Sequence, residues 1–529
     1  MRNPMLRRAI GRYGLTLMLI FGAAVSPVWA DEEAAPEAKK SDDKSKGVVS
    51  VELGKEVYIK RCLGCHGAEG AGDGPAALRF KPVPRDFTKG LFKYKSTPHG
   101  SVPTDEDLIK VVVQGLPGTG MPAWKSILKD NQIRSVVQYI KTFAPQFKDA
   151  APKPITIGPE VKSSPESIEK GKALFKELAC FMCHGEEGRG NGPLAPTLKD
   201  NLGRHVQPRN LTKGWIFRGG GARENIYMRI NTGLMGTPMP SFADKLDNEK
   251  SWHIANYVNS LSQYPGVPNW NVAVMAKPIE GDVADDPDDP RWNDLERHSF
   301  PLVGQVTIDP RMFTPTVDMV TVKAMYNEKD LSLLVIWDDP TKSVATPAAG
   351  ETVPEIFDDA VAIQFPTKML PGTQKPYFIM GDVNHSVYVA RWNGRTNSVD
   401  EFNANGTEVR VGLRITPQEE TNWQFKGKGK YHQGQYKAVF KRPLVTEDKE
   451  TDLQIQPGVF YPIAFTAWDG SNGERDAMRS LSAWYSLYLE VPASNDRFIY
   501  PTLFLLVVVG VEWWIARSYR NGNGNGKQK

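Results

Sequence analysis

Two five-residue stretches hold all four cysteines of this 529-residue chain. They are Cys62-Leu63-Gly64-Cys65-His66 and Cys180-Phe181-Met182-Cys183-His184. C-x-x-C-H is the attachment signature of c-type haem. Two thiols three residues apart on one helical turn can each add to a haem vinyl group, and the histidine that follows then lies under the iron. We therefore predict haem c covalently bound at both stretches, with His66 and His184 as axial ligands of the iron.

Three other uses of paired cysteines fit the sequence less well. Zinc sites built from two C-x-x-C pairs usually separate the pairs by about 15–20 residues, whereas the second pair here follows the first by 180 − 62 = 118. A redox-active C-x-x-C disulfide needs no adjacent histidine, yet both copies have one. A structural disulfide between the two stretches is an alternative in an exported chain.

A methionine occurs at the same distance after each histidine, where the opposite axial position of the iron needs a second donor. Met121 follows His66 by 121 − 66 = 55 residues, and Met239 follows His184 by 239 − 184 = 55. A proline follows each methionine and restricts the loop that would hold the thioether against the iron. We predict Met121 and Met239 as the second axial ligands; the alternative is a methionine that only fills a gap in a core. In the second half two other methionines compete for this role, Met228 and Met235.

The surroundings of the two stretches are repeated as well. Residues 65–75 match residues 183–193, and residues 84–90 match residues 208–214. A repeat that preserves these segments and both histidine-to-methionine separations indicates one structural unit built twice.

Apolar residues recur every three or four positions before each haem stretch and at the end of each half, which predicts amphipathic helices. These helices are expected at residues 55–61, 131–143, 172–178 and 250–261. We predict two all-α units at residues 51–149 and 168–264. A proline-containing linker at 150–167 would join them.

Residues 51–264 resemble a tandem of class I cytochrome c domains, on the attachment stretches, the methionine loops and the repeated segments together. The resemblance implies a small all-α fold around each haem and iron held by histidine and methionine with no vacant position. Such iron exchanges electrons and does not bind oxygen or peroxide. Methionine as an axial ligand raises the potential, which suits an acceptor from a mid- or high-potential donor.

Both ends of the chain carry apolar runs that predict the same topology. Residues 1–30 have an arginine-rich start, an apolar core and a Val28-Trp29-Ala30 cleavage site, so we predict a signal peptide, followed by a flexible spacer at 31–50. Residues 498–516 are apolar and nearly long enough to span a bilayer. Arg517 and Arg520 follow, so the positive-inside rule puts a 517–529 tail in the cytoplasm and the body of the chain on the periplasmic side of the cytoplasmic membrane. The alternatives are a short N-terminal anchor and a buried C-terminal core helix.

After the second unit the pattern changes from helical to β-like. Residues 265–290 include an acidic run and are expected to be a solvated linker. Between 291 and 492, runs rich in Val, Ile, Thr and aromatic residues are bounded by Gly, Pro, Asp and Asn, which predicts a β-sandwich. The runs are residues 319–326, 331–337, 360–365, 386–392, 407–415, 436–440, 462–468 and 482–489.

This β-like region resembles the haem-b domain of ethylbenzene dehydrogenase gamma subunits. The resemblance rests on four segments, at residues 337–341, 357–365, 377–382 and 467–485. Related gamma subunits serve dimethylsulfide dehydrogenase, selenate reductase, chlorate reductase and nitrite oxidoreductase. The resemblance implies one haem b held by a methionine and a lysine; Met380 corresponds to the methionine, and Arg479 stands where the lysine is expected. The alternatives are that Met478 or a lysine elsewhere in the chain is the second iron ligand, or that this haem has been lost. His385 and His432 are further candidate ligands.

The composition excludes several classes of function. A formal net charge of +4 with 61 acidic residues does not suit nucleic-acid binding. The sequence contains no phosphate-binding loop, no dinucleotide-binding fingerprint and no nucleophile elbow. We expect a non-catalytic, membrane-anchored electron-transfer subunit that links a molybdenum catalytic subunit, through an iron–sulfur subunit, to a terminal oxidase or another cytochrome, with a nitrite-oxidoreductase-type complex preferred. The alternatives are a di-haem peroxidase-like enzyme and a β-sandwich that binds a carbohydrate or a partner and carries the c haems as a tail.

Overall fold

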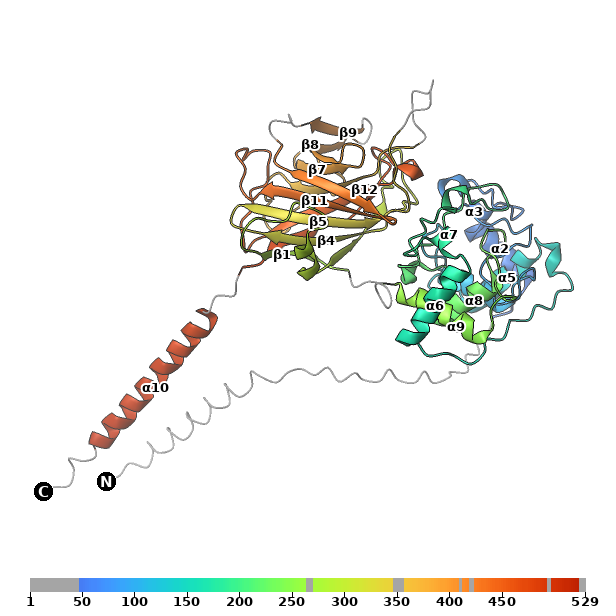
Figure 1. Cartoon of the computed structure of the whole chain (residues 1–529), viewed down its shortest axis with the longest axis horizontal. Helices are drawn as coiled ribbons and strands as arrows, with labels where there is room; N and C mark the ends of the chain where they lie inside the picture. The colour runs from blue at the N-terminus through green and yellow to red at the C-terminus, as the bar shows by residue number, and fades with distance from the viewer. Residues whose placement is uncertain are drawn as a thin grey trace. The chain divides into compact units, whose positions relative to one another are not determined.

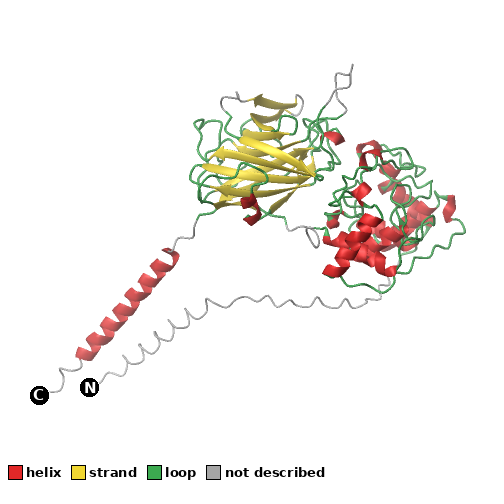
Figure 2. Cartoon of the chain, viewed as in Figure 1, coloured by secondary structure: helices red, strands yellow, loops and turns green. Residues whose placement is uncertain are grey.

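A computed structural model describes residues 47–262, 270–345, 356–408, 412–417, 423–491 and 496–522. The predicted signal peptide, most of the spacer and the last residues of the predicted tail lie outside the described residues. Helices occupy the first half of the chain and strands the second half, with one long helix near the C-terminus (Figures 1 and 2).

The first half contains two helical units with the same order of elements. The first unit has α2 (Val51–Arg61), α3 (Leu63–His66), η1 (Ala77–Arg79), α4 (Asp105–Gln114), α5 (Asp130–Lys141) and η2 (Pro145–Phe147). The second unit has α6 (Pro165–Glu177), α7 (Phe181–His184), η3 (Ala195–Thr197), η4 (Gly214–Ile216), α8 (Arg223–Thr232) and α9 (Asn248–Ser260). The four helices predicted from periodicity are present, while α4 and α8 were not predicted. In α4 the signals for a helix are nonetheless present in the sequence: Leu108 and Val112 recur at helical spacing, and Thr104 caps the first turn.

The first and last helices of each unit cross at a glycine. A Cβ atom added at Gly54 of α2 would lie 2.0 Å from the carbonyl oxygen of Ser135 in α5, and one added at Gly171 of α6 would lie 2.0 Å from that of His253 in α9. Only glycine permits this approach between two helix backbones. Because both units close in this way, each holds the helix that precedes its haem stretch at a fixed place over its own core.

The second half forms one continuous β-sheet. Its strands are β1 (Ala273–Pro278), β2 (His298–Pro301), β3 (Val303–Gly304), β4 (Met319–Tyr326), β5 (Asp330–Asp338), β6 (Ala360–Pro366), β7 (Val387–Asn393), β8 (Ser398–Glu408), β9 (Gly412–Pro417), β10 (Lys426–His432), β11 (Gln435–Pro443), β12 (Phe460–Trp468), β13 (Ser480–Leu481) and β14 (Tyr485–Leu489). The main order is β10-β11-β5-β4-β1-β14-β12-β6-β7-β8-β9. Two short 3₁₀ helices, η5 (Pro290–Asp294) and η7 (Gly470–Asn472), lie in the connections.

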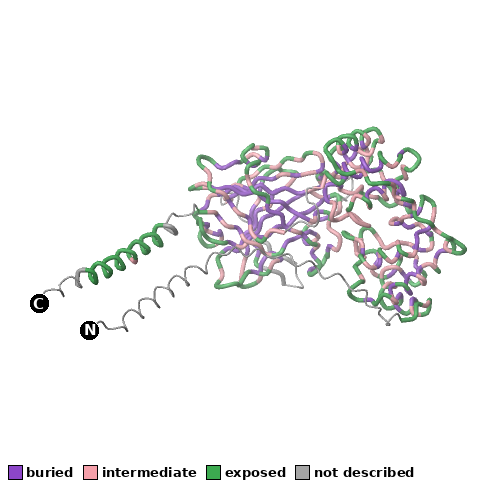
Figure 3. Tube along the Cα trace, turned by 90° about the horizontal axis from the view of Figure 1, so that it is seen from below, coloured by how far each residue is buried: buried purple, intermediate pink, exposed green. Residues whose placement is uncertain are grey.

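The sheet is barrel-like and does not divide into the two separate layers that the sequence predicts. Strand β12 pairs with β14 through Phe460–Ile463 and with β6 through Ala464–Trp468, so one strand belongs to both parts of the sheet. The inner side chains of both parts join one apolar core. The buried residues of this region are the purple stretches of the tube in Figure 3.

The β region also begins earlier than predicted. Strand β1 lies within residues 265–290, for which we expected a solvated linker, and it is central in the sheet, parallel to β14 on one side and to β4 on the other. Val283 and Ala284 of the acidic run are buried, and Asp286 forms ion pairs with Lys428 and Lys430. The expectation failed because β1 is only six residues long and its neighbours are distant in sequence.

The C-terminal helix α10 (Asp496–Gly522) is long and apolar. Its segment from Ile499 to Arg520 has a mean hydropathy of 1.8 and none of it is buried against the rest of the chain, as the green helix in Figure 3 shows. By length and composition it could cross a membrane. It includes the predicted span at 498–516 and extends further at its C-terminal end.

Candidate haem-binding sites

Each cysteine-containing stretch forms one turn of helix that places both thiols and the histidine together. In the first, the backbone N–H groups of Cys65 and His66 both donate to the carbonyl of Cys62, at 3.1 and 2.9 Å. In the second, Cys183 and His184 donate to the carbonyl of Cys180, at 3.2 and 3.0 Å. All four thiols are free, so no disulfide joins the two stretches.

Both histidines are oriented by the same backbone contact. Nδ1 of His66 lies 3.1 Å from the carbonyl oxygen of Arg85, and Nδ1 of His184 lies 3.0 Å from that of Arg209. A carbonyl accepts only from a protonated nitrogen, so Nε2 of each ring is left unprotonated and able to bind a metal. Burial lowers the pKa of both imidazoles and favours this neutral form.

Arg85 and Arg209 occupy matching positions in the two halves, within the repeated segments at residues 84–90 and 208–214. The sequence therefore showed that these segments are repeated, but it did not show what they do. The structure gives a reason, since each segment supplies the carbonyl that fixes a histidine.

The two methionine loops are also built alike. In the first unit Leu116 N–H donates to the carbonyl of Met121 at 3.0 Å, and Met121 N–H donates to Oγ1 of Thr119 at 3.1 Å. In the second unit the corresponding pairs are Leu234 to Met239 at 3.1 Å, and Met239 to Thr237 at 3.3 Å. The glycine that ends the preceding helix has a positive φ in both units. The same backbone path therefore presents both methionines.

In the first unit, the predicted donors line one cavity. Cys62, Cys65, His66 and Met121 all contribute to its wall. Most of the remaining wall is apolar, from residues that include Phe80, Phe92, Leu108, Val112, Trp124, Leu128, Val136 and Ile140. Two thiols for the vinyl groups, a neutral imidazole and a thioether around an apolar space are the donor set of a covalently bound haem, so the residues fit this group.

One edge of this cavity is basic. Arg85, Lys93 and Arg218 line it, and none of the three forms an ion pair within the described part of the chain. Burial and the two neighbouring arginines lower the pKa of Lys93 to about 8. Haem carries two propionate carboxylates, which match the positive charge of these three side chains. The sequence did not reveal Arg218, because it comes from the second unit.

The competing methionines of the second unit lie in other settings. Met235 is buried, and Met228 lines a different cavity together with Tyr94 and Lys95 of the first unit. Met239 is half-buried in the loop that repeats the one around Met121.

The residues proposed for haem b do not form a pair of iron ligands. Met380 is buried in a small cluster of its own, and its sulfur lies 3.3 Å from Nη1 of Arg479. The guanidinium is buried over the ring of Trp468, and burial lowers its pKa to about 10, so it stays protonated. A protonated guanidinium cannot donate a lone pair to iron. Met478 is half-buried in a turn with Arg475, and His385 contacts Asp382. These residues do not fit a haem b held by methionine and lysine.

Comparisons with known proteins identify the helical half. Residues 49–140 match the family described as cytochrome c oxidase, cbb3-type, subunit III, and residues 168–262 match the family described as cytochrome c. The first half of the chain therefore contains two cytochrome c domains, a class that carries covalently bound haem c.

Several relatives match about two fifths of this chain. The cbb3-type cytochrome c oxidase subunit CcoP of Azospirillum brasilense is 30% identical over 216 residues, which are 39% of this chain and 61% of that protein. A putative respiratory nitrate reductase haem subunit of Haloferax mediterranei is 24% identical over 212 residues, 39% of this chain and 71% of that protein. The chain spans about three fifths of the length of the CcoP relatives. A chain in a reducing HAO-like protein complex of Kuenenia stuttgartiensis is 41% identical, over 41% of this chain and 98% of that chain, with a TM-score of 0.39.

Proposed function

We propose that this protein is a membrane-anchored electron-transfer subunit that carries two c haems. The main support for this proposal is the cavity that is lined by two thiols, an imidazole and a thioether in the first domain. The second domain repeats the hydrogen bonds of the histidine and of the methionine. When bound, haem supplies a one-electron redox centre. His66 and Met121 would hold the iron of one haem, and His184 and Met239 would hold the iron of the other. An iron held on both faces has no position for a substrate.

Contacts between the two cytochrome domains support transfer from one haem to the other. Arg218 of the second domain donates to the carbonyls of Pro117 and Gly118, just before Met121 in the first domain. Lys110 Nζ donates to Oδ1 of Asn225 at 3.0 Å, and His99 Nδ1 lies 3.1 Å from the carbonyl of Thr232. Outer-sphere transfer needs rigid ligation and closely spaced cofactors, and these contacts favour both.

We infer the partners of this protein from the names of its relatives and from the resemblance of its β region to gamma subunits. Two relatives belong, by their names, to a cbb3-type oxidase and a respiratory nitrate reductase, which favours a redox enzyme complex here too. The resemblance of the β region to gamma subunits leads us to propose a molybdenum catalytic subunit with an iron–sulfur subunit on the periplasmic side, of nitrite oxidoreductase type. The acceptor would be a terminal oxidase or another cytochrome. Helix α10 would anchor the chain, with its C-terminus in the cytoplasm.

The route omits haem b, because Arg479 contacts the sulfur of Met380. We expect acid–acetone extraction of the purified protein to leave all haem on the polypeptide, since thioether-linked haem resists extraction and non-covalent haem does not. The measurement is the pyridine haemochrome spectrum of both fractions. One extractable haem per chain would restore the haem-b assignment and require Arg479 to move away from Met380.

The test that separates a relay from a di-haem peroxidase is access to the iron. We expect the reduced, detergent-solubilised protein to bind no carbon monoxide and the oxidised protein to turn over no peroxide, because both axial positions are held. The absorption spectrum under carbon monoxide gives the readout, with Met121→Ala as a positive control in which one position is opened. Carbon monoxide binding by the unmodified protein, together with peroxide turnover, would replace the relay by an enzyme.

A further inference from the structure

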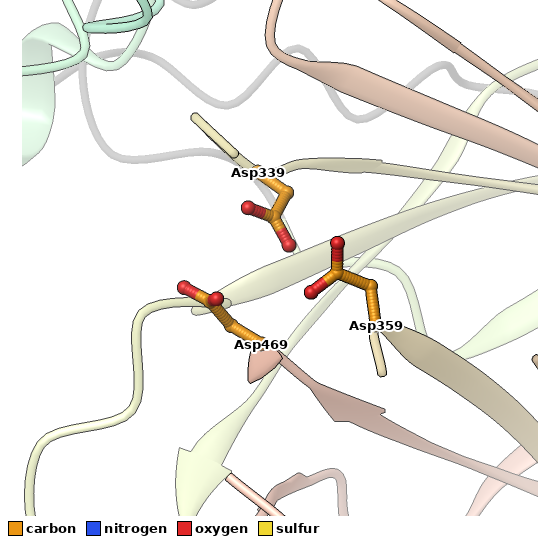
Figure 4. A group of neighbouring side chains, drawn as sticks. All are labelled: Asp339, Asp359 and Asp469. Carbon is orange, nitrogen blue, oxygen red and sulfur yellow. The ribbon is translucent and has the colours of Figure 1, made fainter. Parts of the chain in front are cut away.

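Three buried aspartates from distant parts of the β region face one another. Asp339 follows β5, Asp359 precedes β6, and Asp469 follows β12. Their exposed fractions are 0%, 0% and 1%, and one carboxylate oxygen from each lies within 4.8 Å of the other two. Figure 4 shows the three carboxylates turned toward a shared point. We call Asp339, Asp359 and Asp469 the aspartate cluster.

Most oxygens of the aspartate cluster have protein donors. Asp359 accepts from Ser343 N–H at 2.5 Å and the Tyr436 hydroxyl at 2.8 Å through Oδ2, and from Gly470 N–H at 2.9 Å through Oδ1. Asp469 accepts from the N–H and hydroxyl of Ser471 through Oδ1, at 2.8 and 2.7 Å, and from the Thr316 hydroxyl through Oδ2, at 2.5 Å. These contacts fix the carboxylates in place but bring no positive charge.

Among the residues that the structure describes, one oxygen of the cluster has no hydrogen-bond partner. Asp339 accepts from the N–H and hydroxyl of Thr341 through Oδ1, both at 3.0 Å, while its Oδ2 is buried without a hydrogen bond. A buried acceptor without a partner costs free energy, and more so when it belongs to a charged group. This unpartnered oxygen belongs to Asp339, whose carboxylate faces Asp359 and Asp469 in Figure 4.

The charge of the cluster is uncompensated as well. Within the described residues, no lysine, arginine or histidine forms an ion pair with any of its three members. Three like charges this close repel strongly in a buried setting. A bound cation would remove the repulsion and give the free oxygen a partner.

We propose that Asp339, Asp359 and Asp469 bind one Ca²⁺ ion that ties together the ends of β5, β6 and β12. The donors are all carboxylate oxygens, which suit a hard cation and not Zn²⁺ or Cu²⁺, because neither histidine nor cysteine takes part. Ca²⁺ accepts irregular cages of protein oxygens, including bidentate carboxylates, whereas Mg²⁺ demands near-ideal octahedral geometry and usually keeps several waters. The site joins strands from both parts of the continuous sheet, so its role is structural and independent of electron transfer.

The experiment uses the full-length, detergent-solubilised protein with its haems, stripped with EGTA and dialysed. Adding Ca²⁺ alone should give one bound ion per chain by metal analysis. At 100 times the Kd it should raise the Tm of the β region by roughly 5–10 °C. The same concentration of Mg²⁺ should give a much smaller shift. Equal shifts with both ions would overturn the choice of Ca²⁺, and no shift with either would overturn the site.

Variants test which residues hold the ion. Asp339→Asn should weaken Ca²⁺ binding by on the order of 100-fold, yet the ion-free variant should be at least as stable as the ion-free parent, because one repelling charge is gone and the amide can take the place of the unpartnered Oδ2. A merely structural aspartate would instead destabilise the ion-free protein when replaced. Asp358→Asn is the matched control. It changes the carboxylate next to Asp359 in sequence, which contacts Arg395 and is not part of the aspartate cluster, and it should keep the Ca²⁺ response.

A variant that does not fold would leave the EGTA and Ca²⁺ titration of the unmodified protein as the deciding measurement. The haem spectra and potentials serve as an independent readout. They should be the same with and without Ca²⁺, so failure of this proposal and failure of the electron-transfer proposal are told apart.

Discussion

Replacing Cys180 and Cys183 with serine should reduce the covalently bound haem from two per chain to one, and the same pair of changes at Cys62 and Cys65 should have the same effect. Serine cannot form the thioether bonds, and each helical turn serves only its own domain. The pyridine haemochrome spectrum against protein concentration measures the ratio. Both single-domain variants should keep the other haem, because the two domains have separate cores.

The control for this change lies within the same pentapeptide. Met182→Leu alters a position between the cysteines and should leave two haems per chain, because that side chain has no part in attachment. A double-serine variant that still carried two covalent haems would show that the thiols of that stretch are not the attachment points.

Replacing Met121 or Met239 with alanine should leave the haem attached and lower the midpoint potential of that centre by on the order of 0.1 V or more, within the ~0.8 V that axial ligands span. A thioether favours the reduced iron, and its loss removes that preference. Met121 is the only methionine between residues 51 and 149, so no other thioether in that domain can replace it. Potentiometric titration of the solubilised protein resolves the two centres.

The second domain provides matched controls for the ligand assignment. Met235→Ala and Met228→Ala remove nearby methionines that lie outside the repeated loop, and both should leave the two potentials unchanged. If Met235→Ala shifted one potential and Met239→Ala did not, Met235 would be the ligand and the repeated loop would have another purpose.

Much of the helical half could be predicted because its chemistry is local in sequence. One helical turn brings two cysteines and a histidine together, so the order of residues alone predicts an attachment site for haem c. The amphipathic period predicted the first and last helices of each domain for a similar reason, since each period is read within one element. The repeated segment around Arg85 and Arg209 was visible as well, although its role in orienting the histidines was not.

In the β region the predicted runs match strands β4, β5, β6, β7, β11, β12 and β14. The predicted run at 407–415 covers the end of β8, residues outside the described ranges and the start of β9. The sequence missed strands that depend on their neighbours. Strand β10, Lys426–His432, is rich in lysine and glycine, which are depleted in strands. It forms because Gln433 and Gly434, both with positive φ, make a two-residue hairpin turn that pairs β10 with β11. Strand β1 depends in the same way on two parallel partners far along the chain.

By itself, then, the sequence determined the haem-attachment turns, the paired histidine and methionine spacing, the two-domain repeat and the apolar C-terminal helix, because each is a pattern within a short stretch. Only the tertiary structure decided that the β-sheet is continuous through β12, that Arg479 meets the sulfur of Met380, and that Asp339, Asp359 and Asp469 come together. Residues 130 positions apart (469 − 339) become neighbours only once the strands that carry them have paired, and strand pairing depends on the whole core.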